Sequence, residues 1–359
     1  MIDIRSDTVT KPSPAMRRAM YEAEVGDDVF VEDPTIKALE EETAALLGMG
    51  TGLYVTSGTM GNQIGIWINT REGDEVILER EGHVFNYEAA GPTLLARVQV
   101  RTIPGVRGVI TAEQIRPNIN PPDIHRAPTS LVCIENTHNR AGGAIFPLDE
   151  IERISRLCQE RDMRLHLDGA RLWNATAVTG IAEAEYCRHV DTVSVCFSKG
   201  LGAPVGSVLC GSKEAIAVAR RRRKVLGGGM RQAGIIAAGA LYALRNNRER
   251  LVEDHENAKR LARAVNDLPG FSVDVDHVET NIAFIEVTAP VPAKDVADRL
   301  RAEGVLILAL RPTALRAVTH LDISRADVDR AIEAFARVSK TLPREPAPDY
   351  DPATMGEPE

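Results

Sequence analysis

The stretch that decides the fold is Thr192-Val193-Ser194-Val195-Cys196-Phe197-Ser198-Lys199-Gly200-Leu201-Gly202. Its apolar and β-branched residues predict a buried strand that ends on Lys199, and glycines follow at once. A lysine is rarely buried without a partner, and one taken out of water can form a Schiff base with an aldehyde. Lys199 is therefore a candidate for chemistry, although an ordinary surface lysine at the end of a strand would give the same local pattern.

Strand-like and helix-like patterns alternate on both sides of this stretch, which is typical of an α/β fold. A clear amphipathic helix is expected over 149–162, and long helices over 212–224, 232–246 and 250–267. The alternation predicts a large domain with a mainly parallel (mixed) seven-stranded sheet flanked by helices. Its expected strands are 53–56, 75–78, 98–103, 131–135, 164–168, 192–197 and 206–210.

The pattern changes after Pro269-Gly270, where short strands alternate with helices in what reads as a smaller C-terminal α/β domain. We expect a large domain over 1–250, with the N-terminal segment 1–30 contributing to the active site, and the small domain over 251–342. An acidic, proline-rich tail follows over 343–359.

Composition narrows the class of protein. The chain has 359 residues and a net charge of −8, which argues against nucleic acid as a partner. No apolar run approaches the ~18 residues that span a bilayer, and the N-terminus lacks the features of a signal peptide. The odd number of cysteines without a CxxC pair predicts free core thiols in a reducing cytoplasm, and no histidine spacing predicts a metal.

Three further segments bear on Lys199. The turn Thr56-Ser57-Gly58-Thr59-Met60-Gly61-Asn62 follows a strand and opens a helix, which suits a phosphate but also describes a plain turn. Asp168 ends a predicted strand, where a carboxylate can keep a pyridine nitrogen protonated or can simply cap a helix. His83 follows another strand and could stack on a flat cofactor or lie on a surface loop, whereas His166 is expected to be a packed core histidine.

These signals occur in a fixed order along the chain, each at the end of a strand. The order is phosphate turn, stacking histidine, aspartate and lysine. Together they predict a pyridoxal 5'-phosphate enzyme in which Lys199 forms the Schiff base with the cofactor.

Longer motifs resemble the L-threonine aldolases of the low-specificity type, which are pyridoxal-phosphate enzymes of the aspartate aminotransferase fold (fold type I). The resemblance covers roughly residues 1 to 340. The motifs are Arg5-Ser6-Asp7-Thr8-Val9-Thr10, Glu135-Asn136-Thr137-His138-Asn139, His166-Leu167-Asp168-Gly169-Ala170-Arg171, the run from Ser198 to Ser207, Gly227-Gly228-Gly229-Met230-Arg231-Gln232 and Val318-Thr319-His320-Leu321-Asp322.

The resemblance implies a role for each matching residue in cofactor binding. Lys199 would carry the Schiff base, Asp168 would pair with the pyridine nitrogen and His83 would stack on the ring. The phosphate would be held by Ser57, Gly58 and Thr59. Further cofactor contacts would come from Arg171 and, across the interface of a dimer with shared active sites, from Lys224 and Arg231. A homotetramer is the expected assembly, and the run Arg220–Arg223 is expected to be a solvated helix face.

The same resemblance implies a substrate site. The substrate carboxylate would be bound by Ser6, Arg171 and Arg316, since an arginine fork suits a carboxylate. The reaction would be retro-aldol cleavage of L-threonine, L-allo-threonine and related β-hydroxy-α-amino acids, phenylserine among them, to glycine and an aldehyde. Either His83 or His125, or a water held by one of them, would take the β-hydroxyl proton.

Two alternatives remain at this stage. A β-eliminating lyase on the same fold would share Lys199 and Asp168, and a non-catalytic pyridoxal-phosphate-binding protein would need no carboxylate clamp. A nucleotide-binding protein is excluded, because it would require a P-loop or GxGxxG after the first strand and neither is present.

One segment departs from the family pattern. Asp-Asp-Val-Tyr-Gly is expected near the first helix, whereas this chain has Asp27-Asp28-Val29-Phe30-Val31. If Phe30 lines the substrate site, the pocket is more apolar than in its relatives. We therefore expect a preference shifted toward bulkier or aromatic β-substituents.

Overall fold

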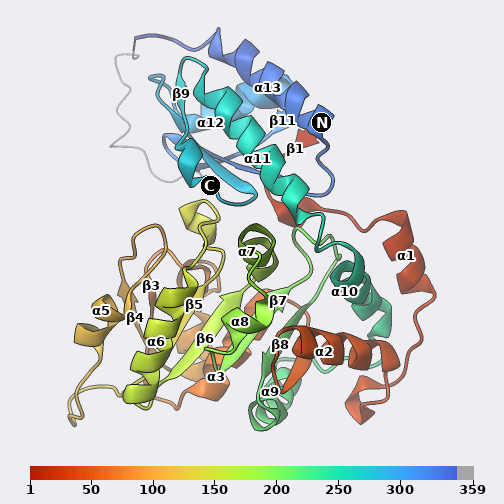
Figure 1. Cartoon of the computed structure of the whole chain (residues 1–359), viewed down its shortest axis with the longest axis vertical. Coiled ribbons are helices and arrows are strands. Elements are labelled where there is room, and N and C mark those ends of the chain that lie inside the picture. The colour runs from red at the N-terminus through yellow and green to blue at the C-terminus, as the bar shows by residue number, and fades with distance from the viewer. Residues whose placement is uncertain (346–359) are drawn as a thin grey trace. The chain divides into compact units, whose positions relative to one another are not determined.

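The structure is a computed structural model of the chain, and residues 1–345 are described. A seven-stranded sheet of order β2-β8-β7-β6-β5-β3-β4 forms the larger part (Figure 1). β8 runs antiparallel to both of its neighbours and the other pairs are parallel, which confirms the predicted mixed, mainly parallel sheet. The strands are β2 (Thr51–Val55), β3 (Glu75–Glu79), β4 (Gln99–Ile103), β5 (Thr129–Glu135), β6 (Arg164–Gly169), β7 (Thr192–Cys196) and β8 (Ser207–Gly211).

Helices flank this sheet as the alternating pattern predicts. In α6 (Leu148–Glu160), the residues Ile151, Ile154 and Leu157 share one face and are all buried, which confirms the amphipathic helix. The other helices of this part are α1 (Pro14–Tyr21), α2 (Pro34–Leu46), α3 (Gly58–Asn69), α4 (His83–Asn86), α5 (Ala112–Ile115), α7 (Leu172–Thr179), α8 (Glu183–Cys187), α9 (Lys213–Val225) and α10 (Gly234–Asn246).

Helix α3 lies unusually close to the sheet, because three glycines form the face that meets it. A Cβ on Gly61 would lie 2.2 Å from Ser194 Oγ, and one on Gly65 would lie 2.5 Å from His166 Cε1. A Cβ on Gly58 would lie 2.6 Å from Cys196 Sγ. Any larger residue would push the helix away, so the glycine spacing sets the distance between α3 and the ends of β6 and β7.

The chain divides into two compact units. The smaller unit contains Met1–Thr10, Gly142–Ala144 and the chain from Glu249 onward, and the larger contains the rest. The first ten residues differ from the expected 1–250 domain, because β1 (Ile2–Asp3) pairs in parallel with β11 (Val305–Leu306). The assignment of each domain's role stays a prediction.

The smaller unit has its own sheet and core. The sheet has the order β12-β13-β10-β9, and helices pack on it through buried residues such as Leu261, Ile285 and Phe335. Its remaining elements are β9 (Phe271–Ser272), β10 (Ile282–Val287), β12 (Leu308–Arg311), β13 (Ala314–Val318), α11 (Leu251–Asn266), α12 (Ala293–Ala302) and α13 (Arg325–Ser339).

Three sequence-based expectations concern the chain as a whole. All five cysteines are buried free thiols, as predicted. Within residues 1–345 no helix combines the length and the apolar character needed to cross a membrane. The expected tail over 343–359 lies almost entirely outside the described residues.

Candidate active site

Six strands of the large sheet end at the same edge. β2 is antiparallel to β8, and β8 is antiparallel to β7, so β2 runs in the same direction as β7 and its parallel neighbours. Ser57 follows β2, His83 follows β3, Asp168 is the second-last residue of β6, and Lys199 follows β7. In open α/β sheets, ligands bind outside the carboxyl ends of the strands, so this edge is the candidate active site.

Asp168 is a buried carboxylate held by hydrogen bonds. Its side chain is only 2% exposed. Asn62 Nδ2 donates to Asp168 Oδ2 at 2.8 Å, and the backbone N–H of Ala170 donates to Oδ1 at 3.0 Å. Helix α7 has Arg171 as its N-cap residue, so the alternative role of Asp168 as a helix cap is not what the structure shows.

His166 supports this arrangement from behind, as a packed core histidine. Its Nε2 lies 3.2 Å from Asn62 Oδ1, and its Nδ1 lies 2.8 Å from Thr192 Oγ1. Burial lowers the pKa of His166 to about 4, so the ring is neutral at physiological pH. Because Asn62 Oδ1 accepts from the ring, the Nδ2 group of Asn62 is directed at Asp168.

His83 opens α4 and belongs to the same cluster. Its Nδ1 lies 2.9 Å from Glu88 Oε1, and its backbone N–H donates to Glu135 Oε2 at 2.7 Å. Burial lowers the pKa of His83, but the hydrogen bond to Glu88 and the negative charges of Asp168, Glu88 and Glu135 outweigh this effect. The net effect is a raised pKa of His83.

The spacing of this cluster raises the question of a metal. His83, Glu88 and Asp168 each offer one ligand-type atom, and these atoms lie within 4.8 Å of one another. However, side-chain amides of Asn62 and Gln63 already donate to both carboxylates. We therefore describe the group as a hydrogen-bonded acid–base cluster and assign it no metal.

Lys199 lies half-buried on a tight turn beyond β7. The turn is closed by Gly202 N–H, which donates to the carbonyl of Lys199 at 2.8 Å. Burial raises the pKa of the Cys196 thiol, and the charge on Lys199 opposes this, with smaller effects from Asp168 and Arg171. The charges of Lys199, Asp168 and Arg171 therefore all act on one buried thiol at the end of β7.

The N-terminus of α3 reaches the same place. The missing Cβ of Gly58 makes room for Cys196 Sγ, as described above. Ser57 is the N-cap residue, and its Oγ accepts a hydrogen bond from the backbone N–H of Met60 at 3.1 Å. The first N–H groups of a helix have no partner within the helix, so those of Gly58 and Thr59 can bind an anion such as a phosphate.

Several predicted site residues of the larger unit lie outside this buried cluster. The imidazole of His125 is 82% exposed and its Nδ1 lies 2.8 Å from Asp123 Oδ1. Lys224 is exposed, and Arg231 Nη1 forms an ion pair with Asp27 Oδ2 at 2.9 Å. Phe30 is 69% exposed on the short 3-10 helix η2 (Asp28–Phe30). Their roles stay predictions.

Ser6 and Arg316 belong to the smaller unit. There Arg316 is buried in β13 and its Nη2 donates to the carbonyl of Arg5 at 3.3 Å. Ser6 Oγ accepts from the backbone N–H of Thr8 at 3.2 Å. The hydrogen bond to Arg5 brings the two predicted carboxylate-binding residues together within that unit, and their role stays a prediction.

The expectation of a solvated face over Arg220–Arg223 is wrong for most of this run. Arg223 is 3% exposed, and its Nη2 pairs with Asp28 Oδ2 at 2.5 Å. Arg220 pairs with Glu40 at 3.0 Å, and the guanidinium of Arg222 stacks over the ring of Trp67. The run was misread because every one of these partners is distant in the sequence.

The segment that departs from the family pattern has an unusual backbone. Val31 adopts φ 59° and ψ 38°, in the left-handed region that favours glycine. This is the position at which the resemblance leads us to expect glycine. The left-handed backbone that suits a glycine is therefore occupied here by a valine, a β-branched residue. This conformation costs about 1–2 kcal/mol of backbone strain at Val31.

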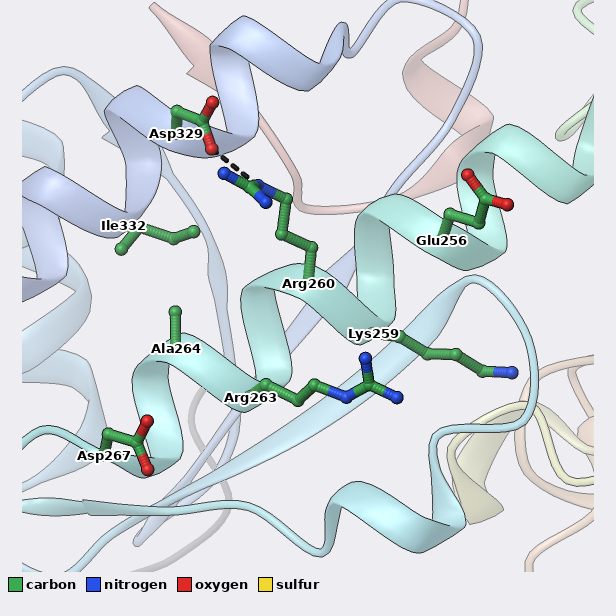
Figure 2. A pocket seen from close by; sticks show the side chains of 8 residues that line it. All are labelled: Glu256, Lys259, Arg260, Arg263, Ala264, Asp267, Asp329 and Ile332. Carbon is green, nitrogen blue, oxygen red and sulfur yellow. Dashed lines mark hydrogen bonds and ion pairs between the residues drawn. The ribbon is translucent and has the colours of Figure 1, made fainter.

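A hollow of about 690 Å³ lies in the smaller unit between α11 and α13 (Figure 2). Its walls carry basic and acidic side chains in equal number, and Arg260 Nε pairs with Asp329 Oδ1 at 2.6 Å. It contains none of the predicted site residues, so its volume does not make it the candidate active site. Its lining residues are Glu256, Lys259, Arg260, Arg263, Ala264, Asp267, Asp329 and Ile332.

Sequence reasoning did not assign a role to four buried polar residues of the site: Asn62, Gln63, Glu88 and Glu135. One signal could have drawn attention to two of them. Asn62 and Gln63 are adjacent polar residues in the otherwise small and apolar α3, which packs on the sheet. Glu88 and Glu135 have no comparable signal, because a single glutamate in a loop or at a strand end is usually solvated.

Comparison with known proteins places the chain in a family. The model of the beta-eliminating lyase family matches residues 3–289. Low-specificity L-threonine aldolase 1 of Arabidopsis thaliana is 39% identical over 347 residues, covering 95% of this chain and 97% of that protein. Low specificity L-threonine aldolase of Escherichia coli K12 is 40% identical over 326 residues, covering 90% of this chain and 95% of that protein.

A solved structure agrees with the fold. The threonine aldolase of Leishmania major superposes with a TM-score of 0.82 at 20% identity, covering 94% of this chain and all of that chain. The chain therefore belongs to the beta-eliminating lyase family, and its resemblance to the low-specificity L-threonine aldolases is confirmed.

Proposed function

We propose that this protein is a pyridoxal 5'-phosphate-dependent aldolase that cleaves L-threonine, L-allo-threonine and related β-hydroxy-α-amino acids to glycine and an aldehyde. The relatives of about 40% identity support this reaction. The single structural observation that carries the proposal is the buried Asp168, which shares one sheet edge with His83, Lys199 and the N-terminus of α3.

The residues at this edge fit the cofactor. Asp168 offers a desolvated carboxylate for the pyridine nitrogen, and the first turn of α3 offers N–H groups for the phosphate. Lys199 offers the amine that would form a Schiff base with the aldehyde. When bound, pyridoxal 5'-phosphate supplies an electron sink for the electron pair left at Cα.

The chain's own residues would then bind the substrate and move its protons. Arg171 is buried at the same edge, which suits a bidentate grip on the substrate carboxylate. Ser6 and Arg316 would add to this grip. His83 is favoured over His125 as the group that takes the β-hydroxyl proton, because His83 lies beside Asp168 whereas His125 is largely exposed.

The assembly and the compartment are part of the same proposal. A homo-oligomer with active sites shared between subunits would give Lys224 a role, since that lysine is exposed in the single chain. Five buried free thiols support a reducing compartment such as the cytoplasm.

Product analysis of the protein loaded with pyridoxal 5'-phosphate tests the reaction. We expect L-threonine to give equal amounts of glycine and acetaldehyde. A β-eliminating lyase is the second candidate, since the matching family model bears that description. That enzyme would release a keto acid and ammonia instead, and such products would contradict the aldolase proposal.

The exposed Phe30 predicts a shift in substrate preference. Restoring a hydroxyl with Phe30→Tyr should raise kcat/KM for L-threonine relative to L-phenylserine about fivefold, the equivalent of one hydrogen bond of about 1 kcal/mol. The reverse exchange at the exposed Tyr21, Tyr21→Phe, serves as a control and should leave the ratio unchanged. An unaltered ratio in Phe30→Tyr would mean that η2 does not line the substrate site.

A further inference from the structure

Glu88 has no role in the proposed chemistry, yet it lies at the centre of the buried cluster. The residue is 3% exposed. Its Oε1 lies 2.9 Å from His83 Nδ1 and accepts from Asn62 Nδ2 at 2.8 Å, and its Oε2 accepts from Gln63 Nε2. All three neighbours are thus arranged around one carboxylate.

The surrounding chain is shaped to keep this carboxylate in place. A Cβ on Gly91 would lie 2.5 Å from the side-chain amide of Gln63, so glycine leaves room for the group that donates to Glu88. Asn62 donates one amide hydrogen to Glu88 and the other to Asp168. His83 and Asp168 are therefore linked through Asn62 and Glu88.

The donors decide which proton form of His83 is present. The side-chain amides of Asn62 and Gln63 can only donate to Glu88, so both oxygens of Glu88 act as acceptors. The contact between Glu88 Oε1 and His83 Nδ1 is therefore a hydrogen bond only if Nδ1 carries a proton. A neutral ring with Nδ1 protonated leaves Nε2 as its only acceptor. The tautomer of His83 is thus set by Glu88, before any cofactor or substrate binds.

Other titratable groups face His83 as well. Asp168 from β6 and Glu135 from β5 add negative charge, and the ring of Tyr87 lies 5.5 Å away. Burial and the nearby Asp168 raise the pKa of Glu88, and its hydrogen bond with His83 opposes this. Glu88 is the group among them that contacts the imidazole nitrogen directly.

We propose that Glu88 is a positioning residue that accepts a hydrogen bond from the Nδ1–H group of His83, so that Nε2 is the nitrogen presented to cofactor or substrate. This inference rests on the proposed function, because it assigns the working nitrogen of the proposed proton acceptor. Because Asn62 donates to both Glu88 and Asp168, the same hydrogen bonds also fix the orientation of His83 relative to Asp168.

Side-chain ¹⁵N NMR of the protein loaded with pyridoxal 5'-phosphate tests the proposal without turnover, with His83 assigned by its loss in His83→Asn. In the wild type, at a pH above the pKa of His83, we expect a neutral ring with Nδ1 protonated. Glu88→Gln should keep this tautomer, because an amide oxygen still accepts, but should lower the pKa of His83 by about one unit or more. Glu88→Ala should lower the pKa equally and give the Nε2-protonated tautomer.

A kinetic measurement separates positioning from a purely structural role. Glu88→Ala should lower kcat for L-threonine about tenfold to a hundredfold with a smaller change in KM, and Glu88→Gln should move the acid limb of the pH profile downward. Glu81→Gln is the matched control, since Glu81 lies in the same loop but pairs with Arg140. It should change neither the tautomer nor the profile.

The outcomes distinguish this inference from the proposed function. An Nε2-protonated ring in the wild type, or an unchanged His83 pKa in Glu88→Ala, would overturn the role of Glu88 even if threonine is cleaved. Failure of the wild type to release acetaldehyde would overturn the proposed reaction while leaving the tautomer result to stand. The wild-type spectrum decides the matter even if Glu88→Ala fails to fold.

Discussion

Lys199→Ala is expected to reduce threonine cleavage by at least about 10³-fold and to abolish the visible absorbance of the loaded protein. The physical reason is that no other residue in the candidate site supplies an amine at the end of β7 for a Schiff base. Loss of an essential nucleophile usually leaves only the residual rate that comes from binding. Acetaldehyde release and the absorption spectrum measure the two effects.

Chemical trapping of the Schiff base tests the role of Lys199 without measuring activity. Borohydride reduction of the loaded wild type should fix the cofactor to the peptide that contains Lys199, as seen by mass spectrometry. In Lys199→Ala that label should be absent. Lys213→Ala is the matched control, because Lys213 is an exposed lysine at the start of α9, and it should retain both the label and the activity.

Folding should be almost unaffected by this change, which separates chemistry from stability. Lys199 is half-buried on a turn held by backbone hydrogen bonds from Gly202 and Ala203, and these bonds remain in the alanine variant. We expect the free energy of unfolding to change by about 1 kcal/mol or less. A label found on another lysine would show that Lys199 is not the attachment point.

The strands and the positions at their ends could be predicted from the sequence because both depend on local patterns. Buried parallel strands are continuous apolar runs, and the residue that interrupts such a run marks the edge where ligands bind. Asp168 and Lys199 were found in this way, since each is a charged residue next to a run of buried ones. Their positions relative to the sheet needed no knowledge of the tertiary contacts.

The buried polar residues that hold the site together could not be predicted in this way, because their roles depend on partners that are remote in the chain. Asn62 reaches Asp168 over a sequence separation of 106 residues, and Arg223 reaches Asp28 over 195. A run of four arginines on a helix gives the same pattern whether it faces water or a buried acid. Whether the arginines lie in water or against a buried acid depends on which side chains pack on α9, and only the tertiary structure shows this.

The sequence and the structure together explain why a glycine is expected at the position of Val31. The resemblance leads us to expect glycine there, and the structure gives the reason, since the backbone is left-handed at that position. The strain of a β-branched residue must be offset by the contacts that hold η2. These contacts include the buried ion pair between Asp28 and Arg223.

Arg223→Met is accordingly expected to lower the free energy of unfolding by about 3 to 5 kcal/mol, the usual cost of breaking a buried pair. The change removes the nearer of the two arginines that pair with the 4%-exposed Asp28, since Arg220 Nη1 stays 3.7 Å from Asp28 Oδ1. It also removes the donor to the carbonyl of Tyr54 at 2.8 Å. Denaturant unfolding followed by circular dichroism measures the effect. Arg221→Met, at the exposed neighbouring position, should change stability by only about 0.5 kcal/mol.

A double variant identifies the cause of this loss. If the buried charge of Asp28, left with only the longer contact to Arg220, is responsible, Asp28→Asn combined with Arg223→Met should recover part of the stability, because that charge is then removed. If the lost packing of the arginine chain is responsible, the double variant will be no more stable than Arg223→Met. Equal unfolding midpoints for Arg223→Met and Arg221→Met would show instead that η2 is held by its other contacts, in which case the strain at Val31 must be offset elsewhere.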